Sequence, residues 1–238
     1  RCDRRHQRIA GDGTVTFSLV VRDEATGAFG IVISSSSPAV ASRCAHARAG
    51  VGVVATQNVT NPALGPAVLD ALAAGADAPS ALAQVLAGEL FPEYRQVTVV
   101  DAAGRTAVHS GANSLGINTH REGENAVAAG NLLADEQVIT ELLDGYSTSS
   151  AASMEERLLD GFRAALAAGG EAGPLHSAGM LVVEDVPWPV TDLRVDHSDD
   201  PLGELAGLWD VWRPQKNDYR VRGVNPTSAP SYGVPGDE

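Results

Sequence analysis

Strand-like segments occur in pairs along this chain, and paired helix-like segments separate them. Runs rich in β-branched residues flank turn residues such as Gly27 and Gly104, which is the pattern of antiparallel hairpins. Strands are predicted at residues 16–22, 29–36, 48–57, 94–101, 105–110, 124–130, 177–184 and 191–195. Helices are predicted at residues 64–74, 79–90, 135–144, 154–168 and 201–212.

This order of elements restricts the fold class. Hairpins build antiparallel sheets, and helices that come in pairs build layers that cover the sheets. A doubly wound parallel sheet would instead alternate single strands with single helices. We therefore expect an α+β fold in which two antiparallel sheets lie between helical layers.

The chain of 238 residues is long enough for one domain with a sizeable core. We assign residues 16–212 to that domain. Residues 1–15 hold four arginines and two aspartates, and they show no strand or helix pattern. This segment is therefore expected to be disordered or removable. Residues 213–238 are rich in Pro, Gly and Ser and are expected to form a C-terminal tail.

Charge and cysteine content argue against several function classes. The formal net charge is −13, whereas binding to nucleic acid or to an anionic membrane requires clustered Lys and Arg. No apolar run approaches the roughly 20 residues that span a bilayer. The two cysteines, Cys2 and Cys44, do not form a disulfide framework, so a cytoplasmic location is expected. Lys216, the only lysine, lies in a polar stretch and is a poor candidate for Schiff-base chemistry.

Thr16 heads the first predicted strand, directly after the basic segment. If the working protein began at this residue, one residue would carry both a hydroxyl nucleophile and the α-amine that activates it. Val15 as an alternative start codon, or self-cleavage before Thr16, would produce that chain. The ordinary alternative is a strand threonine that pairs across a hairpin.

Other polar residues stand where strands end. Four serines, residues 34–37, end the second strand, where a hairpin partner would place Ser35 within hydrogen-bonding reach of Thr16. Asn131 follows another strand, where its amide would donate to an oxyanion or, alternatively, cap a turn. Gln57 and Asn58, at the end of the third strand, likewise would either donate to an oxyanion or cap a turn.

Three further patterns favour structural roles. The glycines of Gly50-Val-Gly52 match a dinucleotide-binding motif loosely, but they are predicted inside a strand rather than in a strand-to-helix turn. Cys44 and His46 form one short-spaced pair without the second pair that a zinc site needs. Metal-dependent hydrolysis by the region of Cys44 and His46 stays an alternative. Trp209 and Trp212, on the last predicted helix, are expected to be core anchors.

Five motifs occur in order along the chain: Thr16-Phe-Ser-Leu-Val-Val-Arg-Asp23, Ala47-Arg-Ala-Gly-Val-Gly-Val-Val-Ala-Thr-Gln57, Glu93-Tyr-Arg-Gln96, Ala129-Gly-Asn-Leu132 and Asp192-Leu-Arg-Val-Asp196. Together they resemble the family known as domain of unknown function 1028. The resemblance implies the four-layer αββα sandwich of N-terminal-nucleophile hydrolases, with Thr16 at the mature N-terminus. Many relatives carry a lysine where this chain has Ser36, so the acid–base role passes to the α-amine.

The expected function is therefore hydrolysis of a small amide or cyclic amide, related to an amino acid or peptide. Thr16 would be the nucleophile, Ser35 would orient it, and Asn131 would hold the oxyanion. Gln57, Asn58, Arg48 and Arg95 are expected to bind the substrate, the arginines through a carboxylate. No metal or cofactor is called for, and a homo-oligomer is expected. The alternative is a non-catalytic binding or assembly module that retains the same fold.

Overall fold

The computed structural model describes residues 16–170 and 172–234 of the chain, so the expectations for residues 1–15 lie outside the described residues. The strands are β1 Thr16–Arg22, β2 Phe29–Ser35, β3 Ala45–Arg48, β4 Gly52–Asn58, β5 Arg95–Asp101, β6 Thr106–Ser110, β7 Thr119–Gly123, β8 Ala126–Asn131, β9 Ser177–Val183 and β10 Pro189–Val195. The α-helices are α1 Ala41–Cys44, α2 Leu64–Ala73, α3 Ala78–Leu86, α4 Gln137–Thr148, α5 Met154–Ala167, α6 Pro201–Trp212 and α7 Lys216–Val224. Two 3₁₀ turns are Pro92–Tyr94 and Pro226–Ser228.

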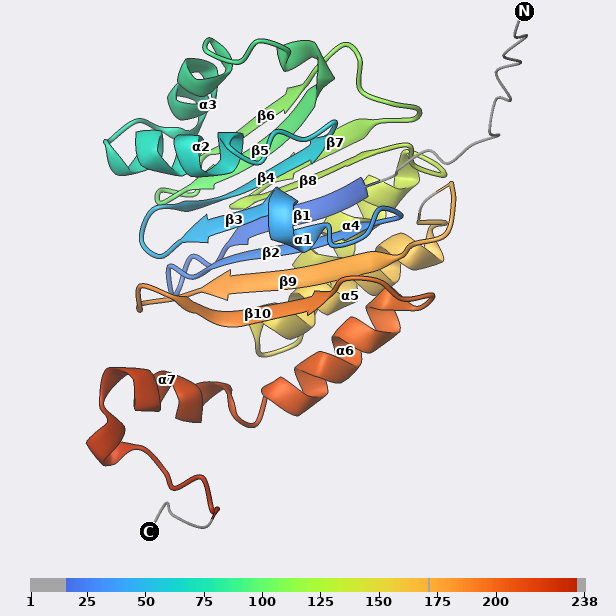
Figure 1. Ribbon diagram of the computed structural model, residues 1–238. Helices are drawn as coiled ribbons and strands as arrows, with labels where there is room; N and C mark the ends of the chain where they lie inside the picture. The colour runs from blue at the N-terminus through green and yellow to red at the C-terminus, as the bar shows by residue number, and fades with distance from the viewer. Residues whose placement is uncertain (1–15, 171, 235–238) are drawn as a thin grey trace, which may run out of the picture.

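Two antiparallel sheets form the centre of the molecule. The larger sheet has the strand order β10-β9-β2-β1-β8-β7, and the smaller has the order β3-β4-β5-β6. Helices α2 and α3 cover the smaller sheet, and α4 and α5 cover the larger one (Figure 1). The expected α+β architecture of two antiparallel sheets between helical layers is therefore confirmed.

Strand β1 shows how the sequence produces these layers, because its side chains alternate between the two faces of the sheet. Phe17 and Leu19 pack in the core that the larger sheet shares with α4 and α5. Val20 packs between the two sheets, against Val53 and Val100 of the smaller sheet. The same alternation turns the side chain of Thr16 toward the layer between the sheets.

Each of the three interfaces between layers has its own apolar core. The core between the larger sheet and its helices contains Phe162, which meets Phe17 edge-on with ring centroids 5.2 Å apart. The core under α2 and α3 contains Val68 and Leu72. Apolar burial at all three interfaces fixes the layers, since burial contributes roughly 25 cal/mol per Å².

Two strand predictions in the first half of the chain were wrong. Residues 48–57, predicted as one strand, contain the last residue of β3, a turn and most of β4, and Gly50 lies in that hairpin turn with a φ of +71°. Strand β7 was missed because its residues are polar and mostly exposed, as suits the edge of a sheet. Gly50 and Gly52 therefore lie in and after a β-turn, not in the strand-to-helix turn that a dinucleotide site needs.

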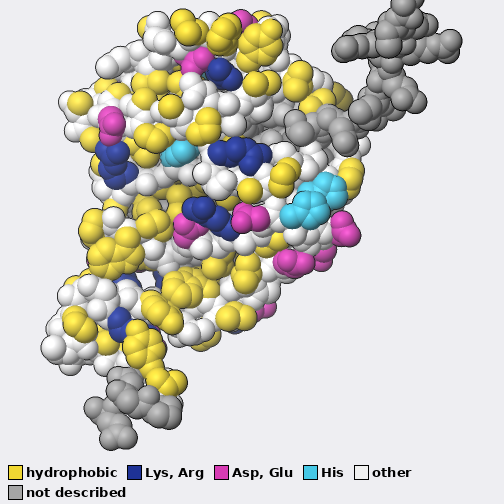
Figure 2. Space-filling model, viewed as in Figure 1, with side chains coloured by type: hydrophobic (Ala, Val, Ile, Leu, Met, Phe, Trp, Pro, Cys, Tyr) yellow, Lys and Arg dark blue, Asp and Glu magenta, His cyan; other side chains and the backbone are white. Residues whose placement is uncertain are grey.

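The C-terminal region is more structured than the predicted tail. Helix α7 follows α6 directly, and Tyr219 of α7 stacks on Trp212 with ring centroids 5.2 Å apart. Lys216 donates hydrogen bonds of 2.7 Å to Glu155 and 2.6 Å to Glu184, and its side chain is only 19% exposed, which the prediction of a polar tail did not anticipate. Val211 of α6 and Val224 of α7 are exposed. Figure 2 shows hydrophobic side chains on the surface of this C-terminal part of the molecule. None of the described helices has the length and apolar character needed to cross a membrane.

Candidate active site

Thr16 is the first residue of β1, between the ends of two neighbouring strands. Its Cα is in register with Ser35 of β2 on one side and with Asn131 of β8 on the other. Residues in register on neighbouring antiparallel strands place their side chains on the same face, with Cβ atoms about 4.5–5.5 Å apart. The three side chains therefore gather at one end of the layer between the sheets, where Thr16 is 6% exposed.

Ser35 is the serine that contacts Thr16, as predicted. The Oγ of Ser35 lies 3.0 Å from Oγ1 of Thr16 and 2.9 Å from Oγ of Ser37. The backbone N–H of Ser37 also donates to Oγ of Ser35 at 3.1 Å. Ser34 points to the opposite face and donates to the carbonyl of Ser177 at 2.9 Å. Strand alternation thus selects Ser35, and not Ser34, to face the threonine.

A chain of hydrogen bonds between neutral side chains joins the two sheets beside Thr16. Ser18 of β1 donates to Oε1 of Gln57 at 2.7 Å, and Nε2 of Gln57 donates to Oε1 of Gln96 at 2.7 Å. Gln57 also donates to the carbonyl of Ala129 at 3.1 Å. All three side chains are at most 1% exposed. Their mutual hydrogen bonds offset the desolvation cost that burying them carries.

Asn131 joins this network from the larger sheet. Its Nδ2 donates to Oε1 of Gln96 at 3.1 Å and keeps a second hydrogen, whereas its Oδ1 is buried without a hydrogen-bond partner among the described residues. Nε2 of Gln96 donates to the carbonyl of Gly130 and to Oγ of Ser110, both at 3.1 Å. Asn131 is 0% exposed, and its side chain bonds to Gln96 rather than capping the turn that follows, the alternative that the sequence left open.

Two of the residues predicted to bind substrate hold loops at the same end of the smaller sheet. Asn58 has a φ of +68°, donates to the carbonyl of Tyr94 at 2.6 Å and accepts from the N–H of Leu115 at 3.1 Å. Arg95 donates to the carbonyl of Val59 at 2.6 Å and to Glu89 at 3.0 Å. These contacts give both side chains structural partners, whereas Nε of Arg95 is buried without one among the described residues.

Arg48 lies away from Thr16 and from the hydrogen-bond network beside it. It lies on β3 opposite Gly52, at the far end of the smaller sheet from Gln57, and donates to Asp70 at 2.8 Å. Both side chains of this ion pair are more than 40% exposed. Arg48 therefore belongs to the surface, and of the four predicted substrate-binding residues only Gln57 is part of the network beside Thr16.

Ser18 and Gln96 belong to the cluster, although sequence reasoning did not single them out. Each carried a signal: Ser18 lies two residues after Thr16, so strand periodicity places it on the same face. Gln96 is an uncharged polar residue near the start of β5, next to the apolar Val97, and it is in register with Gln57. A search for polar residues two positions apart near the ends of paired strands would have identified both Ser18 and Gln96.

The Cys44 region provides no support for the metal-dependent alternative. Burial raises the pKa of the Cys44 thiol to about 11, and burial lowers the pKa of His46 despite a backbone hydrogen bond at the carbonyl of Arg43. A thiol with a raised pKa is a poor source of the thiolate that a zinc ion binds. Across residues 16–170 and 172–234, no three His, Cys, Asp or Glu side chains are grouped so that they could hold a metal ion.

The fold of this chain also occurs in a solved protein structure. The chain resembles the crystal structure of protein SPO2555 from Silicibacter pomeroyi, a DUF1028 protein, with a TM-score of 0.79 and 28% identity, over 86% of this chain and 89% of that one. The Anbu protein (ancestral β-subunit) from Yersinia bercovieri matches with a TM-score of 0.37 and 10% identity, over 92% of this chain and 100% of its own. No curated protein matches the chain significantly. Residues 16–205 match the family of unknown function DUF1028, and the chain belongs to that family.

Proposed function

We propose that this protein is an amide-bond hydrolase of the N-terminal-nucleophile type, whose working form begins at Thr16. The observation that carries the proposal is the position of Thr16 Oγ1, 3.0 Å from Ser35 Oγ and in register with Asn131 at the end of the layer between the sheets. The family match begins at the same residue, Thr16. Two antiparallel sheets between helical layers also agree with the four-layer αββα sandwich of this hydrolase class.

The reaction would proceed by acyl transfer to Thr16. Oγ1 attacks the carbonyl carbon of the amide, and the α-amine of Thr16 accepts the hydroxyl proton directly or through a water molecule. The second Nδ2 hydrogen of Asn131 would donate to the oxyanion, because the first is used by Gln96. The α-ammonium then protonates the departing nitrogen as the C–N bond breaks. Water hydrolyses the resulting ester and returns the proton to Thr16.

The α-amine is the natural base because the side chains of the network are neutral. Ser18, Ser35, Gln57, Gln96 and Asn131 carry no group that accepts a proton near neutral pH. An α-amine has a pKa of about 7.7–8.0, so a useful fraction is unprotonated at neutral pH. A free amine at Thr16 therefore supplies what the side chains lack.

The same neutrality favours a small neutral amide or cyclic amide as the substrate. A carbonyl or amide group exchanges hydrogen bonds with carboxamide and hydroxyl side chains without the cost of burying an unpaired charge. Gln57 and Asn131 both present carboxamides at this end of the sandwich. The reacting group would therefore be held by neutral hydrogen bonds.

The test uses protein that begins at Thr16, with the start verified by intact mass. Such protein should hydrolyse members of a library of small linear and cyclic amides. Thr16→Ala should abolish turnover, and Thr16→Ser should retain part of it because the hydroxyl remains. Equal activity of Thr16→Ala and wild type, or full activity in chains that keep the Val15–Thr16 bond, would refute the mechanism.

A non-catalytic binding or assembly module is the second candidate, and one observation favours it. Thr16 is only 6% exposed, and Ser18, Gln57 and Gln96 are satisfied by one another. A network of this kind also serves a purely structural purpose. Protein that begins at Thr16, folds normally and turns over no amide in the library would support this candidate.

A further inference from the structure

A row of hydroxyl groups connects Thr16 to a guanidinium group. Thr16 Oγ1 lies 3.0 Å from Ser35 Oγ, which lies 2.9 Å from Ser37 Oγ. Nη2 of Arg43 donates to Ser37 Oγ at 2.7 Å. Three successive hydrogen bonds therefore lead from the proposed nucleophile to a permanent positive charge.

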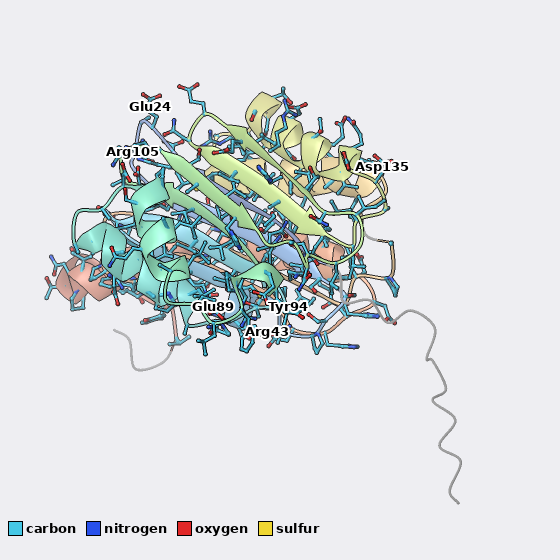
Figure 3. The ribbon with its side chains drawn as sticks, turned by 90° about the horizontal axis from the view of Figure 1, so that it is seen from above. Glu24, Arg43, Glu89, Tyr94, Arg105 and Asp135 are labelled. Carbon is cyan, nitrogen blue, oxygen red and sulfur yellow. The ribbon has the colours of Figure 1, made fainter. Side chains whose placement is uncertain are left out.

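The local backbone holds this row in place. Strand β2 ends at Ser35, and the chain turns through Ala39, whose φ is +54°, into the short helix α1 that carries Arg43. Nη1 of Arg43 donates to the carbonyls of Pro38 at 2.5 Å and Ala39 at 2.9 Å, which fixes the guanidinium against the turn. Ser177 of β9 donates to the carbonyl of Ser37 at 2.6 Å. Figure 3 shows Arg43 on the same side of the molecule as Glu89 and Tyr94, while Glu24 and Arg105 lie on the opposite side.

The charge of Arg43 gives the row a direction. A guanidinium only donates hydrogen bonds, so Ser37 Oγ accepts from Arg43. The positive charge favours hydroxyl groups that turn their oxygen toward it and their hydrogen away. In the favoured arrangement, Arg43 therefore donates to Ser37, Ser37 donates to Ser35, and Ser35 donates to Thr16 Oγ1, which is the final acceptor. Successive hydrogen bonds in one direction polarise one another.

We propose that Arg43 is a positioning residue that activates Thr16 through Ser37 and Ser35. This role rests on the proposed function of Thr16. A hydrogen bond donated by Ser35 stabilises the negative charge that develops on Thr16 Oγ1 during attack. The Thr16 hydroxyl proton is then directed to the α-amine. The nearby positive charge also lowers the pKa of that amine, so more of it is unprotonated at neutral pH.

The experiment measures acylation of Thr16 by a monosubstituted β-lactone, in protein that begins at Thr16. The Thr16 oxygen bonds to the lactone carbonyl carbon, the ring C–O bond breaks, and the hydroxyl proton ends on the released ring oxygen. The protein gains the mass of the whole lactone, which intact-mass and peptide-mapping measurements follow over time. No substrate needs to be known, and Thr16→Ala sets the background.

The proposal predicts two changes in Arg43→Met. The acylation rate should fall by about tenfold, which corresponds to about 1.4 kcal/mol. The midpoint of the rate against pH reports the pKa of the α-amine. It should rise by roughly half a pH unit to one pH unit, because a nearby positive charge is lost. Arg43→Lys should restore both values in large part. Arg163→Met is the matched control, because it removes an exposed arginine from α5 and should change neither.

Ser37→Ala separates the relay from the support that Arg43 gives to the turn. It breaks the row but leaves the bonds of Arg43 to Pro38 and Ala39. Its midpoint should stay at the wild-type value because the charge of Arg43 remains. At a pH above both midpoints its acylation rate should fall as in Arg43→Met, and there the double variant should be no slower than either single variant. If Arg43→Met does not fold, Ser37→Ala with an unchanged melting temperature decides the question.

The outcomes separate the two proposals. One possible result is that Thr16→Ala loses labelling, Arg43→Met keeps the wild-type rate and midpoint, and Ser37→Ala keeps the wild-type rate. This result overturns the relay and leaves Thr16 as the nucleophile. A slower rate in Arg43→Met beside a wild-type rate in Ser37→Ala assigns Arg43 to the structure of the turn and also overturns the relay. Labelling that persists in Thr16→Ala refutes the proposed function itself.

Discussion

Replacing Gln57 by leucine tests the hydrogen-bond network that joins the two sheets. Gln57 is 1% exposed, accepts from Ser18 at 2.7 Å and donates to Gln96 at 2.7 Å and to the carbonyl of Ala129 at 3.1 Å. Leucine has a similar volume, so the change removes three hydrogen bonds without opening a large cavity. We expect the free energy of unfolding to fall.

The size of the effect follows mainly from what Ser18 and Gln96 lose. The Ser18 hydroxyl, which is 0% exposed, loses its acceptor, and a buried group left without a partner costs about 1–3 kcal/mol. Gln96 Oε1 still accepts from Asn131, so the loss there is near that of one ordinary hydrogen bond, about 1 kcal/mol. Burial of the leucine side chain offsets part of this. The net loss should be about 2–3 kcal/mol, or a melting temperature about 5–10 °C lower for a domain of this size.

Urea unfolding of wild type, Gln57→Leu, Ser18→Ala and the double variant forms the assay. Ser18→Ala removes the hydroxyl that Gln57→Leu leaves unpaired, so the double variant should be at least as stable as Gln57→Leu alone. Gln137→Leu, on the exposed face of α4, is the matched control and should change stability by less than about 0.5 kcal/mol. A loss below about 1 kcal/mol in Gln57→Leu, or strictly additive losses in the double variant, would refute the reasoning.

Two further predictions concern charged groups away from Thr16. Lys216→Met should destabilise the protein by about 3–5 kcal/mol, because Glu155, 1% exposed, loses its cation. Burial alone would lower the pKa of Lys216, but Glu155 and Glu184 outweigh it and raise the pKa, so the wild-type advantage in urea unfolding should persist at neutral pH and decline as pH rises well above 10.5. Asp101→Asn should also destabilise, because the carboxylate accepts from the N–H of Ala78 at 3.0 Å. Burial alone would raise the pKa of Asp101, but the hydrogen bonds from Ala78, Arg105 and Ala103 outweigh it and lower the pKa below 3.8. The difference in stability between wild type and variant should therefore vanish as pH falls below 3.8.

The layered fold was predictable because hydrophobic periodicity reports which face of an element is buried. Strand β1 shows this clearly: Phe17 and Leu19 face the helices, and Val20 faces the other sheet. The elements that were missed or mistaken lack that signal. Strand β7 is mostly exposed, and α7 has no fully buried residue, so neither leaves an apolar pattern in the sequence. The role of Lys216 depends on Glu155 and Glu184, which lie far away in sequence.

The candidate site was predictable only in part, for a related reason. The contact of Thr16 with Ser35 follows from hairpin geometry, which pairs residues near in sequence. Gln96 lies on the other sheet, and its bond to Asn131 depends on how the two sheets stack. Periodicity within one strand gives the face of a side chain but not its partner across a layer. Arg48 illustrates the same limit, because its charge suggested substrate binding and its position in the fold places it at the far end of the sheet.

The layer between the sheets changes character along β1, and this change explains why a site forms at one end. Val20 packs in a dry apolar core, whereas Ser18 and Thr16 face carboxamides and hydroxyls. Apolar residues of similar volume would often be as stabilising, so burial alone does not account for the polar end. Directional hydrogen bonds do what apolar contacts do not: Gln96 is bonded to Gln57 on its own sheet and to Asn131 on the other. They fix the spacing of the two sheets at the level of Thr16, which is the rigidity that the proposed nucleophile would require.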